Sequence, residues 1–333
     1  MKQNLHTHST YCDGKSTIKE MIRSALLRDF EVLGFSGHSF TGFDTSYCMS
    51  SDGLMDYLDE IDEAKRLFEE DPEAAKAYFA PEIVNAGDLR IYTGIEQDLY
   101  SDMPALRREK GLLNPGCQYG TFDFVIGSTH AFFVSNEELK ERAFSPDRIL
   151  PPKSGGVVIT ECGIFIYVDY SADVLKWARD TVYRGDAMAL AEAYFKDEAR
   201  IVSKTDCDIV GHFDLLLKFN EREKLFDETD PRYIKARDAA LESVFDDFKA
   251  KGRRPLFEVN TGAMARGYRT TPYPSEEIIK VIRNMGGSFL INSDCHNAEL
   301  LDYGFREAKD LLRKTGFRNV IIDVPGGKLE IFE

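Results

Sequence analysis

Long apolar runs are missing from this sequence. No window approaches the roughly 18 continuous apolar residues of a membrane-spanning helix, so we expect none. The first residues, Met-Lys-Gln-Asn-Leu-His, also lack the apolar stretch of a secretory signal. These two absences predict a cytoplasmic protein with no membrane partner.

Cysteine is sparse, and no two cysteines form a C-x-x-C pair. Disulfide frameworks and zinc fingers need closely spaced cysteines, so both classes are excluded and the pattern fits a reducing cytoplasm. The six cysteines are Cys12, Cys48, Cys117, Cys162, Cys207 and Cys295.

Three common catalytic motifs are absent. The sequence has no G-x-x-x-x-G-K-[ST] loop, no G-x-G-x-x-G after a strand and no nucleophile elbow. Nucleotide-driven and serine-hydrolase chemistry are therefore disfavoured. No internal repeat or low-complexity tract divides residues 1–333, so we expect a single domain of a length typical of one α/β barrel.

Positive charge is in the minority, with 42 Lys and Arg against 57 Asp and Glu and a net charge of −15. Such a surface repels a phosphate backbone, so nucleic acid is not an expected partner. An enzyme for a phosphate ester would need a local positive field here, which bound metal ions supply. No feature of the sequence indicates an oligomeric state.

Seven short runs, nearly continuous in apolar residues, predict strands that are covered on both faces. Helical patterns lie between them, and this alternation favours a mainly parallel sheet, closed into a barrel because of the number of units. The runs are Gln3–His8, Val32–His38, Leu89–Leu99, Phe122–His130, Cys207–His212, Leu256–Thr261 and Gly287–Asp294. The predicted helices are Ser16–Arg28, Asp52–Glu70, Asp173–Lys204 (broken near Gly185), Pro231–Ala250, Ser275–Asn284 and Leu300–Lys314.

The stretch Val134–Tyr170 breaks this rhythm. Its Pro151-Pro152 and Gly155-Gly156 pairs predict a long insertion at the active-site end of the barrel, with a hairpin at Val157–Tyr167. At the end of the chain, Asn319–Phe332 predicts two short strands around Pro325-Gly326-Gly327.

All six histidines lie at the carboxyl edge of a predicted strand or just beyond it. In a barrel these edges face one mouth, so the six imidazoles should converge as they do in a metal cluster. A lone strand histidine is more often a hydrogen-bonded core residue, and only the joint pattern favours the metal. The histidines are His6, His8, His38, His130, His212 and His296.

Carboxylates accompany these histidines. Residues i and i+2 of a strand share a face, which aligns His6 with His8 and, farther on, Asp294 with His296. Asp13 follows the first pair in a loop. A buried Glu96 in the apolar run would be costly unless paired with a cation, and its two oxygens allow it to bridge two metals; a core arginine is the alternative partner.

The motifs occur in the order His-Thr-His with a nearby Asp-Gly, Gly-His-Ser, Gly-Ile-Glu, Gly-Ser-Thr-His, Gly-His-Phe-Asp and Ser-Asp-Cys-His. This order resembles the PHP (polymerase and histidinol phosphatase) family, in particular its histidinol-phosphate phosphatase branch. The branch-like features are Phe122–His130, Tyr194–His212, Glu258-Val259-Asn260-Thr261 and Pro272-Tyr273-Pro274-Ser275. The resemblance implies a distorted (β/α)7 TIM-like barrel and two to three divalent transition metal ions, for which zinc, iron and manganese all suit the ligands.

The resemblance also implies how the ligands divide among three metals. The first would be held by His6, His8, Glu96 and Asp294, and Glu96 would bridge to a second metal held by His130 and His212. The third would be held by Asp13, His38 and His296.

Arginine is the natural fork for a phosphate, and Arg266 follows a predicted strand end. An ordinary surface loop arginine is the alternative. Asn260 and Arg184 are further substrate-binding candidates, and Arg269 and Lys153 are weaker ones. The catalytic residues are predicted to be Glu96, Arg266 and Asp294. Asp214, two residues after His212, would support a ligand or end a strand.

The predicted activity is a metal-dependent phosphomonoesterase that hydrolyses L-histidinol phosphate to L-histidinol and phosphate in histidine biosynthesis. One alternative is a phosphatase for phosphotyrosine proteins, nucleotides or another small phosphoester; another is a non-catalytic metal-binding regulatory protein. Carboxylate and aromatic residues suited to the cationic leaving group occur in the segments near the mouth: Asp44, Tyr47, Glu161, Asp169, Tyr170 and Tyr268.

Overall fold

Seven parallel strands form the centre of the protein, and each falls within a predicted run. The computed structural model describes residues 1–83, 87–102, 122–142 and 150–333, so Cys117 and residues 143–149 of the predicted insertion lie outside the described residues. The strands are β1 (Gln3–Asn4), β2 (Val32–Phe35), β3 (Arg90–Asp98), β4 (Phe124–Ser128), β8 (Ile209–Val210), β9 (Leu256–Asn260) and β10 (Ser288–Asn292).

These strands lie side by side in the order β1-β2-β3-β4-β8-β9-β10, and every pair among them is parallel. The sheet curls so that its first and last strands approach each other beyond their regular segments. Thr7 bridges Cys295, with the His8 N–H donating to the Cys295 carbonyl at 2.9 Å and the Cys295 N–H to the His6 carbonyl at 3.2 Å. The carboxyl ends of the strands therefore gather around one mouth.

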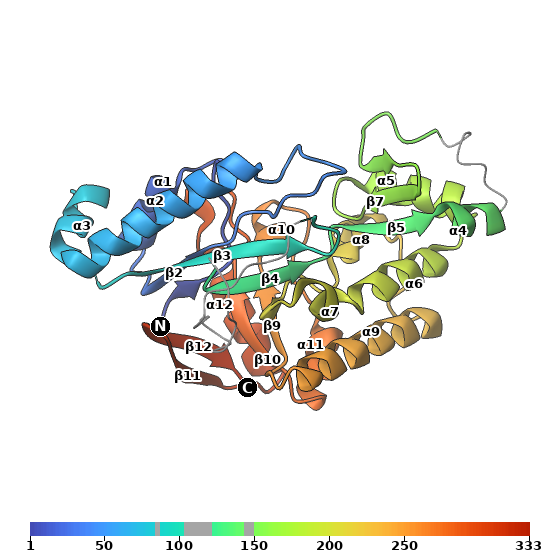
Figure 1. Ribbon diagram of the computed structural model, residues 1–333. Helices are drawn as coiled ribbons and strands as arrows, with labels where there is room; N and C mark the ends of the chain where they lie inside the picture. The colour runs from blue at the N-terminus through green and yellow to red at the C-terminus, as the bar shows by residue number, and fades with distance from the viewer. Residues whose placement is uncertain (84–86, 103–121, 143–149) are drawn as a thin grey trace.

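The opposite end of the curled sheet is filled with apolar side chains and covered by the last two strands. β11 (Asn319–Val324) and β12 (Gly327–Phe332) form the predicted hairpin, and β12 pairs antiparallel with β10. The Gln3 side chain donates to the Glu330 carbonyl and accepts from the Glu330 N–H, both at 2.7 Å, which ties the two ends of the chain together (Figure 1). The interior apolar cluster comprises Leu5, Val32, Tyr92, Phe124, Ile126, Ile209, Leu256, Leu290, Leu329 and Ile331.

Helices cover the outside of the sheet. Helix α1 (Ile18–Leu27) begins at a capping box, in which Thr17 accepts from the Glu20 N–H and the Glu20 carboxylate accepts from the Thr17 N–H, as its sequence predicts. Helix α2 (Ser51–Glu70), predicted as Asp52–Glu70, buries an apolar face that includes Leu58, Ile61 and Ala64. The other covering helices are α3 (Pro72–Phe79), α9 (Pro231–Ala250), α11 (Glu276–Asn284) and α12 (Phe305–Lys314), with short turns α8 (Asn220–Glu223), α10 (Gly262–Ala265), η3 (Leu215–Leu217) and η4 (Ala298–Leu300).

The predicted helix Asp173–Lys204 is divided into four pieces. They are α5 (Ala172–Trp177), the π-helical turn η2 (Ala178–Val182), α6 (Ala187–Glu198) and α7 (Ile201–Thr205). The break near Gly185 is confirmed, since Arg184 and Gly185 both have positive φ, at 54° and 88°. Asp186 then caps α6 by accepting from the Ala189 N–H.

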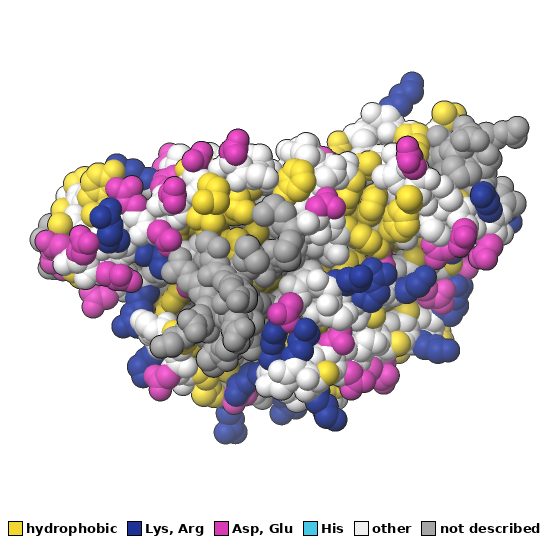
Figure 2. Space-filling model, in the orientation of Figure 1, with side chains coloured by type: hydrophobic (Ala, Val, Ile, Leu, Met, Phe, Trp, Pro, Cys, Tyr) yellow, Lys and Arg dark blue, Asp and Glu magenta, His cyan; other side chains and the backbone are white. Residues whose placement is uncertain are grey.

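The insertion builds a second, antiparallel sheet beside the mouth, in the order β5-β7-β6. The predicted hairpin is confirmed as β6 (Val157–Ile159) and β7 (Gly163–Tyr167), whereas β5 (Ala131–Ser135) and α4 (Asn136–Glu141) are additional. Phe43 stacks on Phe165 of β7 with ring centroids 3.9 Å apart, joining the loop after His38 to this sheet. Apolar side chains gather over this part of the molecule (Figure 2).

No helix among the described residues is long and apolar enough to cross a membrane.

Candidate metal centre

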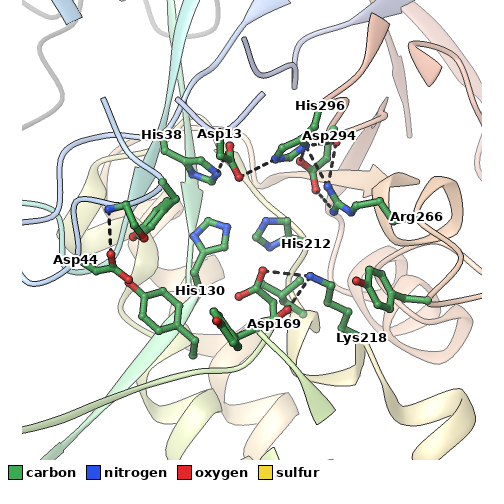
Figure 3. Close-up of a pocket in the computed structure, with 16 residues that line it drawn as sticks. Asp13, His38, Asp44, His130, Asp169, His212, Lys218, Arg266, Asp294 and His296 are labelled. Atoms are coloured by element: carbon green, nitrogen blue, oxygen red, sulfur yellow. Dashed lines mark hydrogen bonds and ion pairs between the residues drawn. The ribbon is translucent and has the colours of Figure 1, made fainter. Parts of the chain in front are cut away.

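The strand ends bring all nine predicted ligand residues to the mouth of the curled sheet. Six imidazoles and three carboxylates come from six strand ends, and Figure 3 shows the rings of His38, His130, His212 and His296 turned toward a common centre. His6 and His8 lie in the chain beyond β1, and both are fully buried. The predicted convergence is thus present in the fold, while the role of these residues as ligands stays a prediction.

Glu96, in β3, lies in the middle of the cluster and is 1% exposed. Its Oε2 faces imidazole nitrogens of His6, His8 and His38, and its Oε1 faces those of His130 and His212. The distances are 3.4 Å to His6, 3.5 Å to His8, 2.9 Å to His38, 3.3 Å to His130 and 3.1 Å to His212. A carboxylate whose two oxygens face separate sets of imidazoles is placed to bridge two metal ions.

The potential ligand atoms form three overlapping groups, each with its atoms within 4.8 Å of one another. The groups are His8, Asp13, His38 and His296; His6, His8 and Glu96; and His38, Glu96 and His130. These groups resemble the three predicted ligand sets. They differ in that His8 and His38 each belong to two of the groups, whereas each was predicted to hold one metal. Asp294 completes the first set, since its Oδ1 is 3.3 Å from His8 Nε2.

Two backbone features aim the carboxylates of Asp13 and Asp294. The loop after His8 turns tightly, with the Gly14 N–H donating to the Ser9 carbonyl at 3.1 Å. A Cβ at Gly14 would lie 2.5 Å from the Ser9 nitrogen, so the Asp-Gly pair needs its glycine. Asp294 has φ of 49°, a left-handed conformation that aspartate tolerates better than most residues.

Several buried polar atoms in the cluster lack a hydrogen-bond partner in the described structure. They include His6 Nε2, His8 Nε2, His38 Nδ1 and Glu96 Oε2; the last two lie 2.9 Å apart but not in hydrogen-bond geometry. Unsatisfied buried polar atoms are rare because each costs on the order of 1–3 kcal/mol. Four of them facing one centre is the arrangement that a bound cation would satisfy, so the residues fit metal ions.

Two further carboxylates orient the imidazoles from behind. Glu258, in β9, lies 2.9 Å from His6 Nδ1, and Asp98, at the end of β3, lies 3.1 Å from His130 Nδ1. Such partners fix which ring nitrogen is free for a metal. Asp214, for which the sequence left open a supporting role or a turn at the strand end, accepts from the Ser275 N–H at 2.9 Å, and no hydrogen bond joins it to His212 in the described residues.

Glu258 is itself held in place. Its oxygens accept from the His212 backbone N–H at 2.9 Å, from Asn260 Nδ2 at 2.7 Å and from Asn292 Nδ2 at 2.8 Å. Asn260 therefore supports the cluster from below and is not among the residues that line the cavity above it.

The electrostatics of the cluster favour ionised carboxylates, whereas the imidazoles differ from one another. Burial lowers the pKa of the imidazoles, but nearby carboxylates outweigh it at His6, where Glu258 and Glu96 hold the pKa well above its usual range, and at His38 and His130, where Glu96 raises it. Burial, with His296 and His38 close by, lowers the pKa of His8 to about 3. Burial opposes ionisation of Glu96, but the neighbouring His6, His38 and His130 outweigh it and hold its pKa well below the usual range. The same balance, with Arg266 as the main counter-charge, holds the pKa of Asp294 well below its usual range.

A cavity of about 300 Å³ opens above the cluster. It contains five of the six residues proposed for the leaving group: Asp44, Tyr47, Asp169, Tyr170 and Tyr268. Glu161 is not among the lining residues, because it lies in the exposed turn between β6 and β7. Lys218 and Tyr167 line the same cavity and were not predicted from the sequence.

Of the four basic residues considered for phosphate binding, Arg266 lines the cavity, and Arg184, Arg269 and Lys153 do not. Arg266 lines the cavity, with one guanidinium nitrogen 2.9 Å from Asp294 Oδ2 and another 3.0 Å from His296 Nδ1. Arg184 is exposed, donates to the Arg142 carbonyl and does not line the cavity, because the positive-φ turn before α6 carries it outward. Arg269 is buried and stacks on Tyr273, with its guanidinium 4.6 Å from the ring centroid. Lys153 is exposed and also lies outside the cavity lining.

The two cysteines beside predicted ligands make ordinary contacts. Cys12 Sγ lies 3.4 Å from His8 Nδ1, and Cys295 Sγ donates to the Asn297 carbonyl at 2.7 Å. Burial raises the pKa of both thiols to about 11, so both are protonated at neutral pH.

A curled parallel sheet with a histidine and carboxylate cluster at its carboxyl ends defines a class of α/β metal-binding fold. The PHP domain profile matches residues 4–262, and the chain belongs to the PHP domain family. No curated protein matches the sequence.

Two solved structures share the fold. One is the "putative histidinol phosphatase hisK" from Listeria monocytogenes, with a TM-score of 0.60, 16% identity, and coverage of 92% of this chain and 99% of that one. The other is histidinol phosphate phosphatase HISK from Lactococcus lactis subsp. lactis, solved with zinc, L-histidinol and phosphate. It has a TM-score of 0.52, 15% identity and 98% coverage of both chains. At such identities the likeness concerns the fold.

Proposed function

We propose that this chain is a metal-dependent phosphomonoesterase that hydrolyses L-histidinol phosphate to L-histidinol and inorganic phosphate. The observation that carries the proposal is the cluster of nine potential ligands with Arg266 beside it, at the base of a cavity. Membership of the PHP family supports it, as does the Lactococcus lactis relative solved with zinc, histidinol and phosphate. We further propose that the curled sheet is the family's distorted (β/α)7 barrel and that residues 1–333 form one domain.

The residues of the cluster suit two to three zinc, iron or manganese ions. Glu96 would bridge two of them, one also held by His6, His8 and Asp294 and the other by His130 and His212; Asp13, His38 and His296 would hold a third. When bound, such ions supply a nucleophile from water at neutral pH and stabilise charge on the phosphoryl oxygens. Glu258 and Asp98 keep the imidazoles in the required orientation.

The cavity also matches the chemistry of the leaving group. L-Histidinol carries a cationic amine and an imidazole, and the lining offers the carboxylates of Asp44 and Asp169 with the rings of Tyr47 and Tyr170. The Asp44 carboxylate faces the cavity from the side opposite Arg266 (Figure 3). An ester with its phosphate at the histidine cluster would therefore place an organic cation among acids and aromatic rings.

A panel of substrates tests this function. We expect kcat/KM for histidinol phosphate to exceed that for a phosphotyrosine peptide, a nucleoside monophosphate and a sugar phosphate by more than tenfold, about 1.4 kcal/mol of transition-state discrimination. A smaller preference would leave the phosphatase activity supported but would contradict histidinol phosphate as the substrate. Bound metal without turnover of any ester would instead favour a regulatory metal-binding protein.

A further inference from the structure

Lys218 has a position in the cavity that neither the sequence motifs nor the metal cluster accounts for. It follows His212 by six residues, and the turn η3 fixes the path between them. The Leu215 N–H donates to the His212 carbonyl and the Lys218 N–H to the Leu215 carbonyl, both at 2.9 Å. The Lys218 side chain is 9% exposed, and it lines the same cavity as His212.

The surroundings of the ammonium leave one of its donors free. The ammonium nitrogen Nζ lies 5.0 Å from the Tyr268 ring centroid and 5.7 Å from that of Phe219. Nζ donates to the Asp169 carbonyl at 2.8 Å and lies 3.3 Å from Asp169 Oδ2. An ammonium has three N–H donors, so two such contacts leave a third for a ligand in the cavity.

Two cations of the cavity lie on one side of it, each paired with a lining carboxylate: Lys218 with Asp169 and Arg266 with Asp294. Among the described residues that line the cavity, Lys218 is the only lysine and Arg266 is the only arginine. Both approach the cavity from the same side (Figure 3). Asp44 lies on the other side. Arg266 lies at the Asp294 and His296 end of the cluster, and Lys218 follows His212. A phosphoryl group at the cluster would have a cation at each end of this wall.

We propose that Lys218 is a second phosphoryl-binding residue, which acts together with Arg266. Arginine can grip two oxygens in a plane, whereas lysine supplies a compact charge for a third. Asp169 is then a positioning residue that aims the ammonium. The inference rests on the proposed function for its ester substrate, but binding of inorganic phosphate tests it without turnover.

The test uses metal-loaded protein and compares wild type with variants that change the charge or the shape of the side chain at position 218. Lys218→Met keeps an unbranched side chain of similar length and removes the charge, and Lys218→Arg restores a cation. Lys196→Met, at an exposed lysine of α6 that pairs with Glu138, is the matched control. The measurements are inorganic phosphate binding by calorimetry, its inhibition constant against ester hydrolysis, and metal content.

We expect Lys218→Met to weaken phosphate binding about ten- to hundredfold, the range for a lost charged hydrogen bond. Metal content should stay at the wild-type level. Lys218→Arg should recover most of the affinity, and Lys196→Met should equal wild type. Arg266→Ala should weaken phosphate binding in the same assay.

Two outcomes would overturn the role of Lys218. One is unchanged phosphate affinity in Lys218→Met. The other is an equal loss of affinity in Lys218→Arg, because a cation at this position would then not be what binds phosphate. If no ester is hydrolysed while Lys218→Met still weakens phosphate binding, the proposed function fails and the assignment of Lys218 stands.

Discussion

At the scale of single residues, Glu96 shows how the cluster depends on a buried charge. A carboxylate that is 1% exposed would normally take up a proton or a counter-charge. Five imidazoles surround it, within 3.5 Å of its oxygens. Metal ions held by those imidazoles would give Glu96 a permanent counter-charge, and the bridging carboxylate would in turn hold two ions together.

Glu96→Gln tests this role, because it keeps the shape of the side chain and removes its charge. We expect metal content and turnover to fall together, with turnover reduced at least about hundredfold. Elemental analysis and steady-state kinetics provide the two measurements. Glu242→Gln, an exposed position in α9, is the control. Full metal content in Glu96→Gln would exclude a bridging role.

The sequence predicts those site residues whose positions follow from their neighbours in the sequence. His6 and His8, two residues apart in the extended segment that continues β1, share a face because of this spacing alone. Glu258 was missed although the reasoning for Glu96 applies equally to it, since it too is an acid inside an apolar strand, LFEVN. Asp98 was missed although it lies two residues after Glu96 on the same strand and hence on the same face. No motif around Lys218 indicates a role in the site, because its position in the cavity depends on the turn η3 and on the insertion.

At the scale of elements, all seven parallel strands were predicted because two-sided burial gives each a nearly continuous apolar run. The run Cys207–His212 contains a regular strand of only two residues, β8, since both neighbours contact it over a short register. Helix α3 was missed: its eight residues follow α2 after a single residue, Asp71, which ends one helix and caps the next. Strand β5 was missed because its partner β7 lies 28 or more residues away in the sequence.

Helix α6 links the insertion to the metal cluster through two buried acids at its end. Asp197 accepts from the Phe133 N–H of β5 at 3.1 Å and from the Tyr100 hydroxyl at 2.5 Å. Glu198 lies beside Thr129, the residue before His130, and its Oε1 has no hydrogen-bond partner in the described structure. Burial raises the pKa of Glu198 to about 8, so the folded protein holds this proton at neutral pH.

This raised pKa predicts a pH-dependent cost in stability. Between pH 4.5, the ordinary value, and about 8, the folded state holds the Glu198 proton and the unfolded state releases it. Stability therefore falls as pH rises through this window. Glu198→Gln removes the difference, so its Tm should exceed that of wild type by an amount that grows from near zero at pH 4.5 to roughly 3 °C or more at pH 8.

Thermal unfolding of both proteins from pH 4.5 to 8.5, at constant metal concentration, measures this difference. Glu192→Gln, at a partly exposed acid of the same helix, is the control and should show a constant offset from wild type. A Tm difference for Glu198→Gln that does not change with pH would mean that Glu198 is ionised in the folded protein.

At the scale of the whole molecule, a net charge of −15 accompanies a buried cluster of ionised carboxylates. On the face shown in Figure 2, acidic and basic side chains are interspersed, so the negative charge does not form one continuous patch there. The concentration of negative charge that matters chemically lies inside the mouth. It draws cations to the cluster, and bound metal ions would reverse its sign locally, so that a phosphate ester could bind to an acidic protein.

Removing the metals therefore tests the architecture as a whole. A ligand that binds only the folded state stabilises it in proportion to the logarithm of its concentration over its Kd. Without metal ions, the buried atoms of His6, His8, His38 and Glu96 that face the centre lack hydrogen-bond partners in the described structure. We expect purified protein to contain two to three equivalents of transition metal, and a strong chelator to lower Tm by about 5 °C or more and to abolish hydrolysis. Adding back zinc or manganese should restore both Tm and hydrolysis in wild type but not in Glu96→Gln. A metal content near zero, with Tm and hydrolysis unaffected by the chelator, would show that the six imidazoles converge for a purely structural reason.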